Sequence, residues 1–104
     1  MKIIEKENFS NYQIYEDGYV FSVQKCRFLK MSKNNSGYKN VTLYDDNKVK
    51  HVFLCHKLVY ETFNNVIVEK GYDVDHINND KNNNNLSNLQ ILTHKENCLK
   101  KFNK

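Results

Sequence analysis

The sequence predicts an α+β fold, in which a small antiparallel β-sheet module is followed by a helix and then by a strand, a loop, a strand and a second helix. Between Tyr12 and Leu54, short runs rich in Tyr, Val, Phe and Ile alternate with turn signals, a pattern typical of antiparallel strands. Residues 56–63 place apolar side chains at the i, i+3 and i+4 spacing of an amphipathic helix. Residues 73–102 have the pattern of two strands joined by a long loop and followed by a helix.

The chain has 104 residues, the length of a single small domain. We expect residues 10–55 to form a β-meander module and residues 56–104 to form the second part of the same domain. No apolar run approaches the roughly 20 residues of a membrane-spanning helix. The N-terminus MKIIEKENFS is charged too early for a signal peptide. We therefore expect no membrane segment.

Cysteine usage indicates a reducing compartment. The three cysteines are Cys26, Cys55 and Cys98. They show no C-x-x-C spacing, and any disulfide within the chain leaves one thiol unpaired. We expect a cytoplasmic protein with reduced thiols.

Turn residues divide the β module into strands. Asp17-Gly18 suits a two-residue hairpin turn, and Asp45-Asp46-Asn47 provides a second, acidic turn. The expected paired strands are residues 12–15 with 19–23 and residues 40–44 with 49–55. We expect them to form one small antiparallel sheet, with the basic stretch 25–39 at its edge.

The second part begins with the helix over residues 56–63, which is expected to pack on the sheet. Gly71 then turns the chain into a strand over residues 73–77. The stretch INNDKNNNNLSNL that follows is rich in asparagine, but predicted strands flank it, so we expect one constrained loop. Asparagine side chains mimic turns and tolerate left-handed backbone, so they can satisfy the loop's own backbone groups.

The last helix has a sequence-encoded start. After an alternating strand over residues 89–92, Thr93 and Glu96 form an S/T-x-x-E capping box. A helix therefore begins at His94, with Asn97 in its first turn.

Asp75 and His76 place a carboxylate beside an imidazole, and Asn97 follows across the loop. Carboxylate and amide oxygens are ligands that suit Mg²⁺, and free imidazole, with a pKa of about 6.5, can accept a proton at neutral pH. A divalent metal together with a base is what phosphodiester hydrolysis requires. Neighbours on a regular strand point to opposite faces, so both side chains reach one phosphate only where the strand bulges or ends. We expect an irregular strand end at His76.

The segment DVDHINNDKNNNNLSNLQILTHKEN resembles the motif of the HNH endonucleases, also called His-Me finger or ββα-metal nucleases. HKLVYETF is similar to the helix that precedes this motif in homing-type members, and YQIYEDGYVFS is similar to the small β module often attached to them. The resemblance covers nearly the whole chain. It implies a ββα-metal core over residues 73–102 and a metal-dependent DNA endonuclease of the homing or mobile-element kind, of phage, viral or mobile-element origin.

Residue by residue, the resemblance implies that Asp75 and Asn97 hold one Mg²⁺ or Mn²⁺ ion and that His76 is the general base. Asn88 corresponds to the central asparagine, whose side chain ties the long loop to the backbone. The literal motif ends in histidine, and His94 lies close enough to compete. Asn97 is preferred because its position matches and an oxygen ligand suits Mg²⁺ better than imidazole. One site per chain implies nicking as a monomer, and a double-strand break only from a homodimer.

Three further residues are secondary candidates for the site: His94, Lys101 and His56. His94 and Lys101 share a helical face with Asn97 and are candidates for phosphate contacts, although a solvated surface role explains them equally well. His56 opens the earlier helix, where a histidine is more often structural.

The balance of 16 basic and 12 acidic residues gives a net charge of +4, which favours a polyanionic partner. We expect this partner to be double-stranded DNA. The candidate DNA-binding residues are Lys25, Arg27, Lys30, Lys33 and Lys39. A solvated lysine surface is the plain alternative.

Spacing alone allows two other metal sites. The pairs His51/Cys55 and His94/Cys98 offer zinc-type ligands, but i, i+4 pairs on a strand and on a helix differ in reach, so we expect no structural zinc. The residues Asn78, Asp80, Asn82 and Asn84 alternate as in a calcium loop. The glycine and the bidentate glutamate of such a loop are missing, however, because Asn83 and Leu89 occupy their positions.

The chief alternative from a different class is a DNA-binding module that has the nuclease fold and cleaves little or not at all. The presence of Asp75, His76, Asn88 and Asn97 argues against it, because binding alone requires none of them.

Overall fold

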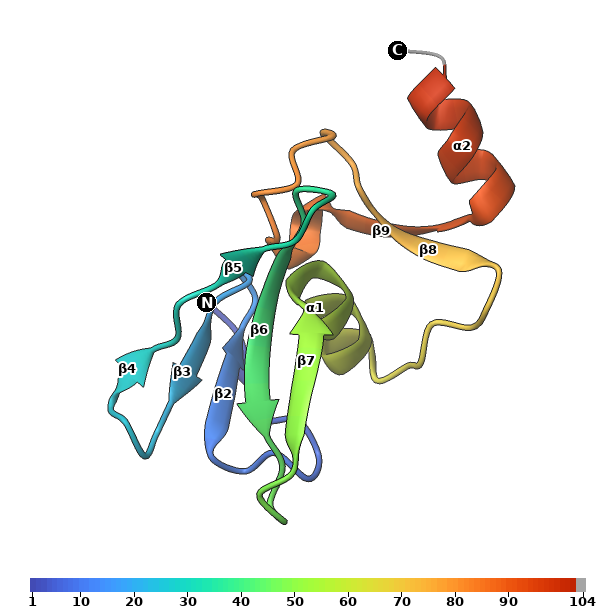
Figure 1. Ribbon diagram of the computed structural model, residues 1–104. Helices are drawn as coiled ribbons and strands as arrows, with labels where there is room; N and C mark the ends of the chain where they lie inside the picture. Colours follow the sequence, from blue (N-terminus) through green and yellow to red (C-terminus); the bar gives the residue numbers. More distant parts are fainter. Residues whose placement is uncertain (103–104) are drawn as a thin grey trace.

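The computed structural model describes residues 1–102, with side chains described as far as Lys100 (Figure 1). The described elements of the first half are β1 (Ile3–Ile4), β2 (Tyr12–Tyr15), β3 (Val20–Ser22), β4 (Arg27–Phe28), β5 (Ser32–Lys33), β6 (Lys39–Tyr44) and β7 (Lys50–Leu54). Those of the second half are α1 (Cys55–Asn64), β8 (Tyr72–His76), the 3-10 turn η1 (Leu86–Asn88), β9 (Leu89–Thr93) and α2 (His94–Phe102). The predicted α+β class is confirmed.

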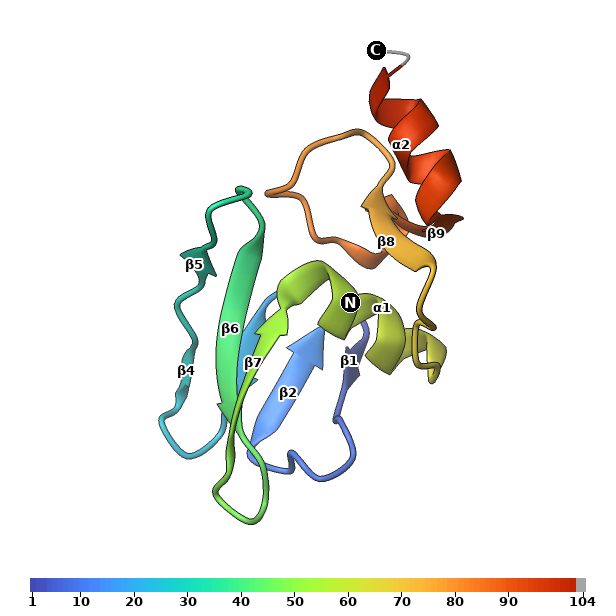
Figure 2. The same ribbon diagram turned by 45° about the vertical axis from the view of Figure 1, so that its right-hand side comes forward.

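The strands of the described residues form three antiparallel sheets with the orders β1-β2-β3-β4, β5-β6-β7 and β8-β9. The prediction of one sheet in the β module is therefore wrong in this detail, because the basic stretch adds β4 to the first sheet and β5 to the second. The two hairpins that the turn residues predicted are present, with Ile14 opposite Val20 and Tyr44 opposite Lys50. Figure 2 shows these two sheets side by side, with α1 at one end of them.

Strand alternation produces the core. Ile14, Val20, Val41 and Leu43 are buried at period two, and the residues between them on each strand are more exposed. They form one cluster with the apolar face of α1, which contributes Cys55, Leu58 and Val59, and with Val74 and Leu89 of the β8-β9 hairpin. The helix therefore joins the β module to the hairpin (Figure 1).

The capping box at the start of α2 is confirmed. The backbone N–H of Glu96 donates to Thr93 Oγ1 at 3.1 Å, and the backbone N–H of Thr93 donates to Glu96 Oε1 at 3.0 Å. The preceding strands pair regularly from Tyr72 opposite Thr93 to His76 opposite Leu89. Strand β8 ends at His76, as predicted, but the pairing is regular up to this residue and the expected irregularity is not present.

The asparagine-rich loop is ordered by its own side chains. The side-chain oxygens of Asn78, Asp80, Asn83 and Asn85 each accept from the backbone N–H two residues further on, at 2.9 to 3.3 Å. Asn79 takes the left-handed conformation, with φ at 65°. The prediction that asparagines satisfy the backbone of this loop is confirmed.

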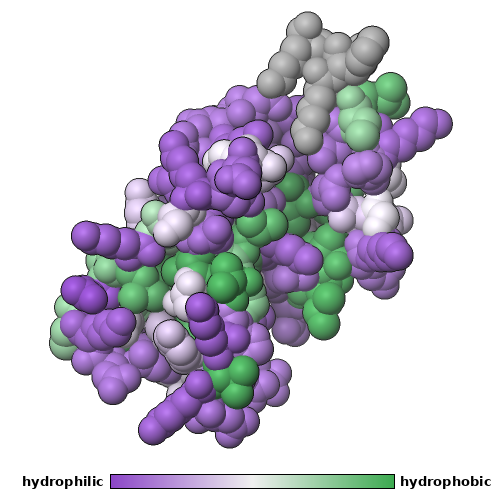
Figure 3. Space-filling view, viewed as in Figure 1, coloured by the Kyte–Doolittle hydropathy of each residue, from purple (hydrophilic) through white to green (hydrophobic). Residues whose placement is uncertain are grey.

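The face of the molecule seen in Figure 3 is largely hydrophilic, with hydrophobic residues showing over its middle. Neither helix of the described residues has the length and apolar character needed to cross a bilayer.

The cysteines provide a test of the core. Burial raises the pKa of the Cys55 thiol to about 12, and its Sγ lies 3.4 Å from Met31 Sδ, whereas Cys26 and Cys98 are exposed. Because the thiolate is the reactive form, a disulfide reagent should modify Cys26 and Cys98 in the native protein and Cys55 only after unfolding. The thiol count in buffer and in denaturant measures this. Cys55→Ser should remove only the denaturant-dependent thiol, and rapid native modification of Cys55 would contradict the placement.

Candidate functional site

His76, the last residue of β8, is buried but has polar neighbours. The residue is 3% exposed, and its Nε2 lies 2.7 Å from Asn84 Oδ1. An amide oxygen only accepts hydrogen bonds, so the neutral imidazole carries its proton on Nε2. Nδ1 is then the nitrogen that can accept a proton.

Two rings, those of His56 and Tyr38, pack against this imidazole and against each other. The rings of His56 and His76 lie 4.9 Å apart between centroids. Tyr38, which directly precedes β6, stacks on His56 at 4.9 Å and on His76 at 6.0 Å. Rings from three segments that are distant in sequence thus form one cluster, and His56 lies next to His76 in it.

His56 is itself held neutral. Burial, together with the neighbouring His76 and Lys57, lowers its pKa to about 4, although Asp73 and Asp75 act in the opposite direction. His56 therefore packs against His76 as an uncharged ring at neutral pH.

The opposite face of the β8-β9 hairpin carries two carboxylates. Asp73 and Asp75 are two residues apart on β8, so both point toward α2. Asp75 Oδ2 accepts from Gln90 Nε2 at 2.9 Å and from Lys100 Nζ at 2.5 Å. The same ammonium donates to the carbonyl of His76 at 2.8 Å, at the end of the strand.

Asn97 is buried on the same side. Its Nδ2 donates to Asp73 Oδ2 at 3.0 Å, and His94 Nδ1 lies 3.1 Å from the same oxygen. The Oδ1 atom of Asn97 is buried without a hydrogen-bond partner among the described residues. Such an atom is unfavourable unless a ligand completes it.

These oxygen donors fit a hard divalent cation. Asp75 faces α2, and the unsatisfied Oδ1 of Asn97, which belongs to that helix, is an oxygen ligand of the type that Mg²⁺ prefers. The structure describes no direct contact between Asp75 and Asn97. It describes no cluster of three or more His, Cys, Asp or Glu side chains suited to a metal, so a cation here depends on the amide as well as on carboxylate.

The zinc-type pairs have other neighbours. His51 Nε2 lies 2.9 Å from Asp45 Oδ2, and Cys55 contacts Met31. His94 Nε2 lies 3.7 Å from Cys98 Sγ on the surface of α2.

Asn88 closes the asparagine-rich loop. Its Oδ1 accepts from the backbone N–H of Asn78 at 3.1 Å, and its Nδ2 donates to Asn78 Oδ1 and to the Asn83 carbonyl. It does not contact His76 or Asp75 through any described hydrogen bond. Its position is that of a residue that shapes the loop.

A cleft of about 330 Å³ lies beside the site. Its lining includes Tyr38, His56, Asp73 and Asn97, but neither Asp75 nor His76. A phosphate-sized group in this cleft can therefore approach the oxygens of Asp73 and Asn97 next to the ring cluster.

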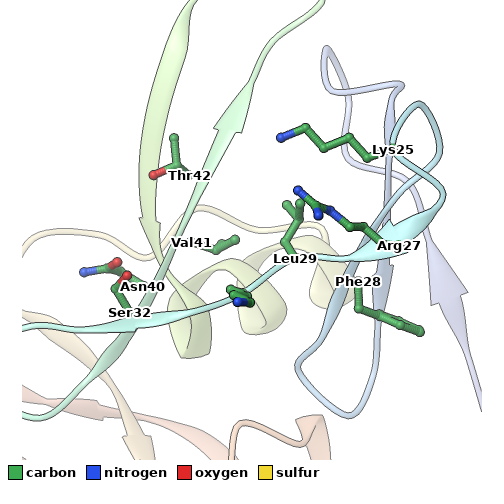
Figure 4. Close-up of a pocket in the computed structure, with 9 residues that line it drawn as sticks. Lys25, Arg27, Phe28, Leu29, Ser32, Asn40, Val41 and Thr42 are labelled. Carbon is green, nitrogen blue, oxygen red and sulfur yellow. The ribbon is translucent and has the colours of Figure 1, made fainter.

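The predicted basic residues are divided between two places. Lys25, Arg27 and Lys30 line a hollow of about 350 Å³ together with Asn40 and Thr42 of β6. Figure 4 shows Lys25 and Arg27 reaching into this hollow.

The other two predicted residues lie outside this hollow. Lys33 is exposed on β5. Lys39 lines a separate hollow beside the asparagine-rich loop. The side chain of Lys101 is outside the described residues.

Sequence reasoning missed four residues of the site: Asp73, Lys100, Asn84 and Tyr38. The sequence could have identified Asp73, because the i, i+2 spacing on a strand places it on the same face as Asp75. The others contact the site only through tertiary packing.

Residues 53–99 match the family described as HNH endonuclease. The chain is 38% identical over 93 residues to an uncharacterized HNH endonuclease of Acanthamoeba polyphaga mimivirus, a match that covers 89% of this chain and 28% of the relative. A second uncharacterized HNH endonuclease of the same virus is 34% identical over 83 residues, covering 80% of this chain and 21% of the relative. The chain thus spans less than a third of the length of these relatives.

Among solved structures, the chain is similar to the HNH homing endonuclease I-HmuI, whose structure is described as one of DNA binding and cleavage. The TM-score is 0.86 at 28% identity, and the match covers 99% of this chain and 59% of that chain.

The pKa of His56 predicts a pH-dependent stability. The group binds a proton more weakly in the folded than in the unfolded chain, so its contribution is present above about pH 6.5 and is lost as the pH falls toward 4. We expect His56 to make the protein about 2 kcal/mol less stable at pH 5 than at pH 7. Urea unfolding of the wild type and of His56→Gln at both pH values measures this. Equal pH dependence in the two proteins would contradict it.

Proposed function

The chain belongs to the HNH endonuclease family, and we propose that it is a DNA endonuclease of the homing or mobile-element kind. It would hydrolyse phosphodiester bonds with one divalent cation and with His76 as the general base. The observation that carries the proposal is the end of β8. There, an imidazole with its proton directed to Asn84 follows directly after Asp75. Asn97 presents an unsatisfied amide oxygen from the adjoining helix.

His76 would act through Nδ1. Because Nε2 donates to Asn84, Nδ1 can take a proton from a water molecule as that water attacks the phosphorus. The new P–O bond forms as the bond to the leaving oxygen breaks, and the leaving oxygen takes up a proton from solvent. Packing of the buried ring against Tyr38 and His56 restricts its rotation and keeps Nδ1 in one direction.

Asp75 and Asn97 would hold the cation, which we propose to be Mg²⁺ or Mn²⁺. When bound, it would supply stabilisation of the charge that develops on the leaving oxygen. Lys100 already places a positive charge against Asp75 and the strand end, where it can also contact a phosphate. Asp73 orients Asn97 by accepting from its Nδ2, which leaves Oδ1 as the ligand atom.

DNA binding is proposed to use the basic hollow of Lys25, Arg27 and Lys30. Clustered basic side chains neutralise successive phosphates and position a duplex without reading its sequence. One site per chain makes a nick the expected product.

The first test is the general base. His76→Ala should lower the rate of plasmid nicking in Mg²⁺ by about 10²-fold or more, while DNA affinity in a gel shift is retained. Asp75→Asn should also abolish nicking. His51→Ala is the matched control, because His51 contacts Asp45, Phe9 and Phe53 rather than residues of the site, and this variant should nick as the wild type does.

Two outcomes would contradict the proposal. Wild-type nicking by His76→Ala would exclude this histidine as the base. A wild-type protein that shifts DNA but fails to nick it in either Mg²⁺ or Mn²⁺ would establish the alternative of a non-cleaving DNA-binding module.

The second test concerns the basic hollow. The double substitution Lys25→Ala and Arg27→Ala should weaken binding to unrelated duplexes uniformly and reduce the slope of log affinity against log salt by about two, roughly one per phosphate contact. Lys50→Ala, on the strand at the other edge of the β5-β6-β7 sheet, is the control and should change neither quantity. An unchanged salt slope in the double variant would place DNA elsewhere.

A further inference from the structure

Asn84 contacts the imidazole of His76 directly. It lies in the middle of the asparagine-rich loop, is 5% exposed, and accepts from His76 Nε2 at 2.7 Å. A buried amide in this position fixes both the tautomer and the direction of the ring. The question is then what holds Asn84.

The β2-β3 turn of the N-terminal module presses directly on Asn84. Gly18 has a φ of +97°, and a Cβ added there would lie 2.7 Å from Asn84 Cβ and 2.9 Å from the Asn84 carbonyl oxygen. Atoms at such distances overlap, so this approach requires glycine. Two residues after Asn84, the backbone N–H of Leu86 donates to the carbonyl of Glu16 at 2.7 Å.

A second contact holds the far side of the loop. Lys81 Nζ donates to the carbonyl of Ser36 at 2.7 Å and lies 4.6 Å from the centroid of the Tyr38 ring. Tyr38 in turn stacks on His56 and His76. Figure 2 shows the loop reaching from the β8-β9 hairpin to the turn between β5 and β6.

We propose that Asn84 is the positioning residue for His76 and that the Asp17-Gly18 turn holds Asn84 in place, so that the N-terminal β module sets the orientation of the imidazole. This inference rests on the proposed function of His76. It assigns the module a role in catalysis in addition to DNA binding. A displacement of about 1 Å in a reacting group can lower a rate about 10²-fold, so small shifts of Asn84 are sufficient to affect cleavage.

The variants separate positioning from general stability. Asn84→Ala removes the acceptor, whereas Asn84→Asp keeps an oxygen in the same place. Gly18→Ala adds the Cβ that meets Asn84. Gly71→Ala is the matched control, because Gly71 has nearly the same φ, +96°, and nothing within 4 Å of an added Cβ.

The primary measurement is the Nε2–H resonance of His76 in the ¹⁵N NMR spectrum, which is observable when the proton is hydrogen-bonded and protected from exchange. The wild type, Asn84→Asp and Gly71→Ala should show it. Asn84→Ala and Gly18→Ala should lose it while thermal unfolding confirms that both are folded. The same two variants should lose about 10²-fold in the single-turnover nicking rate, with unchanged DNA affinity.

The outcomes distinguish this inference from the proposed function. If Asn84→Ala keeps the resonance and nicks as the wild type does, the positioning role is overturned while His76 can remain the base. If Gly18→Ala behaves as Gly71→Ala does, the coupling to the turn is overturned. Wild-type nicking by His76→Ala would instead overturn the proposed function, whatever the spectra show.

Discussion

The alternation of side chains along β8 is the constraint on which the site depends. Asp73 and Asp75 face α2, whereas Val74 and His76 face the core and the ring cluster. A two-stranded hairpin has only these two faces, so oxygen donors and an imidazole on one strand can serve the same phosphate only at its end. Strand β8 ends at His76, and there Lys100 binds both Asp75 and the His76 carbonyl.

Each face of the hairpin is completed by a different part of the chain. On the α2 side, the carboxylate of Asp73 accepts from Asn97 and that of Asp75 accepts from Lys100, and oxygen donors of this kind suit a cation beside the unsatisfied Asn97 oxygen. On the other side, neutral groups surround the imidazole, and burial keeps His56 uncharged. The cation site and the base thus lie in environments of different charge, although their residues are neighbours in sequence.

Local patterns predicted most of this fold because most of its elements have local causes. The alternation of apolar and polar residues predicted β2, β3, β6 and β7. The capping box predicted the start of α2, and the reciprocal Thr93–Glu96 hydrogen bonds are found there. The strands β1, β4 and β5 were missed because each has only two residues, which is too short to show an alternating pattern. Contacts such as Lys100 with Asp75 and Tyr38 with His76 join residues far apart in sequence, so the spacing of residues along the chain could not predict them.

The close approach of Gly18 to Asn84 has a consequence for how such chains diversify. A β module that met the rest of the protein only through a linker could be replaced by recombination with any other targeting element. Here Gly18 of the turn lies against Asn84 of the loop. A chimera joined near the start of α1 would therefore need a glycine at the same position of its first hairpin. The two halves are therefore constrained to evolve together.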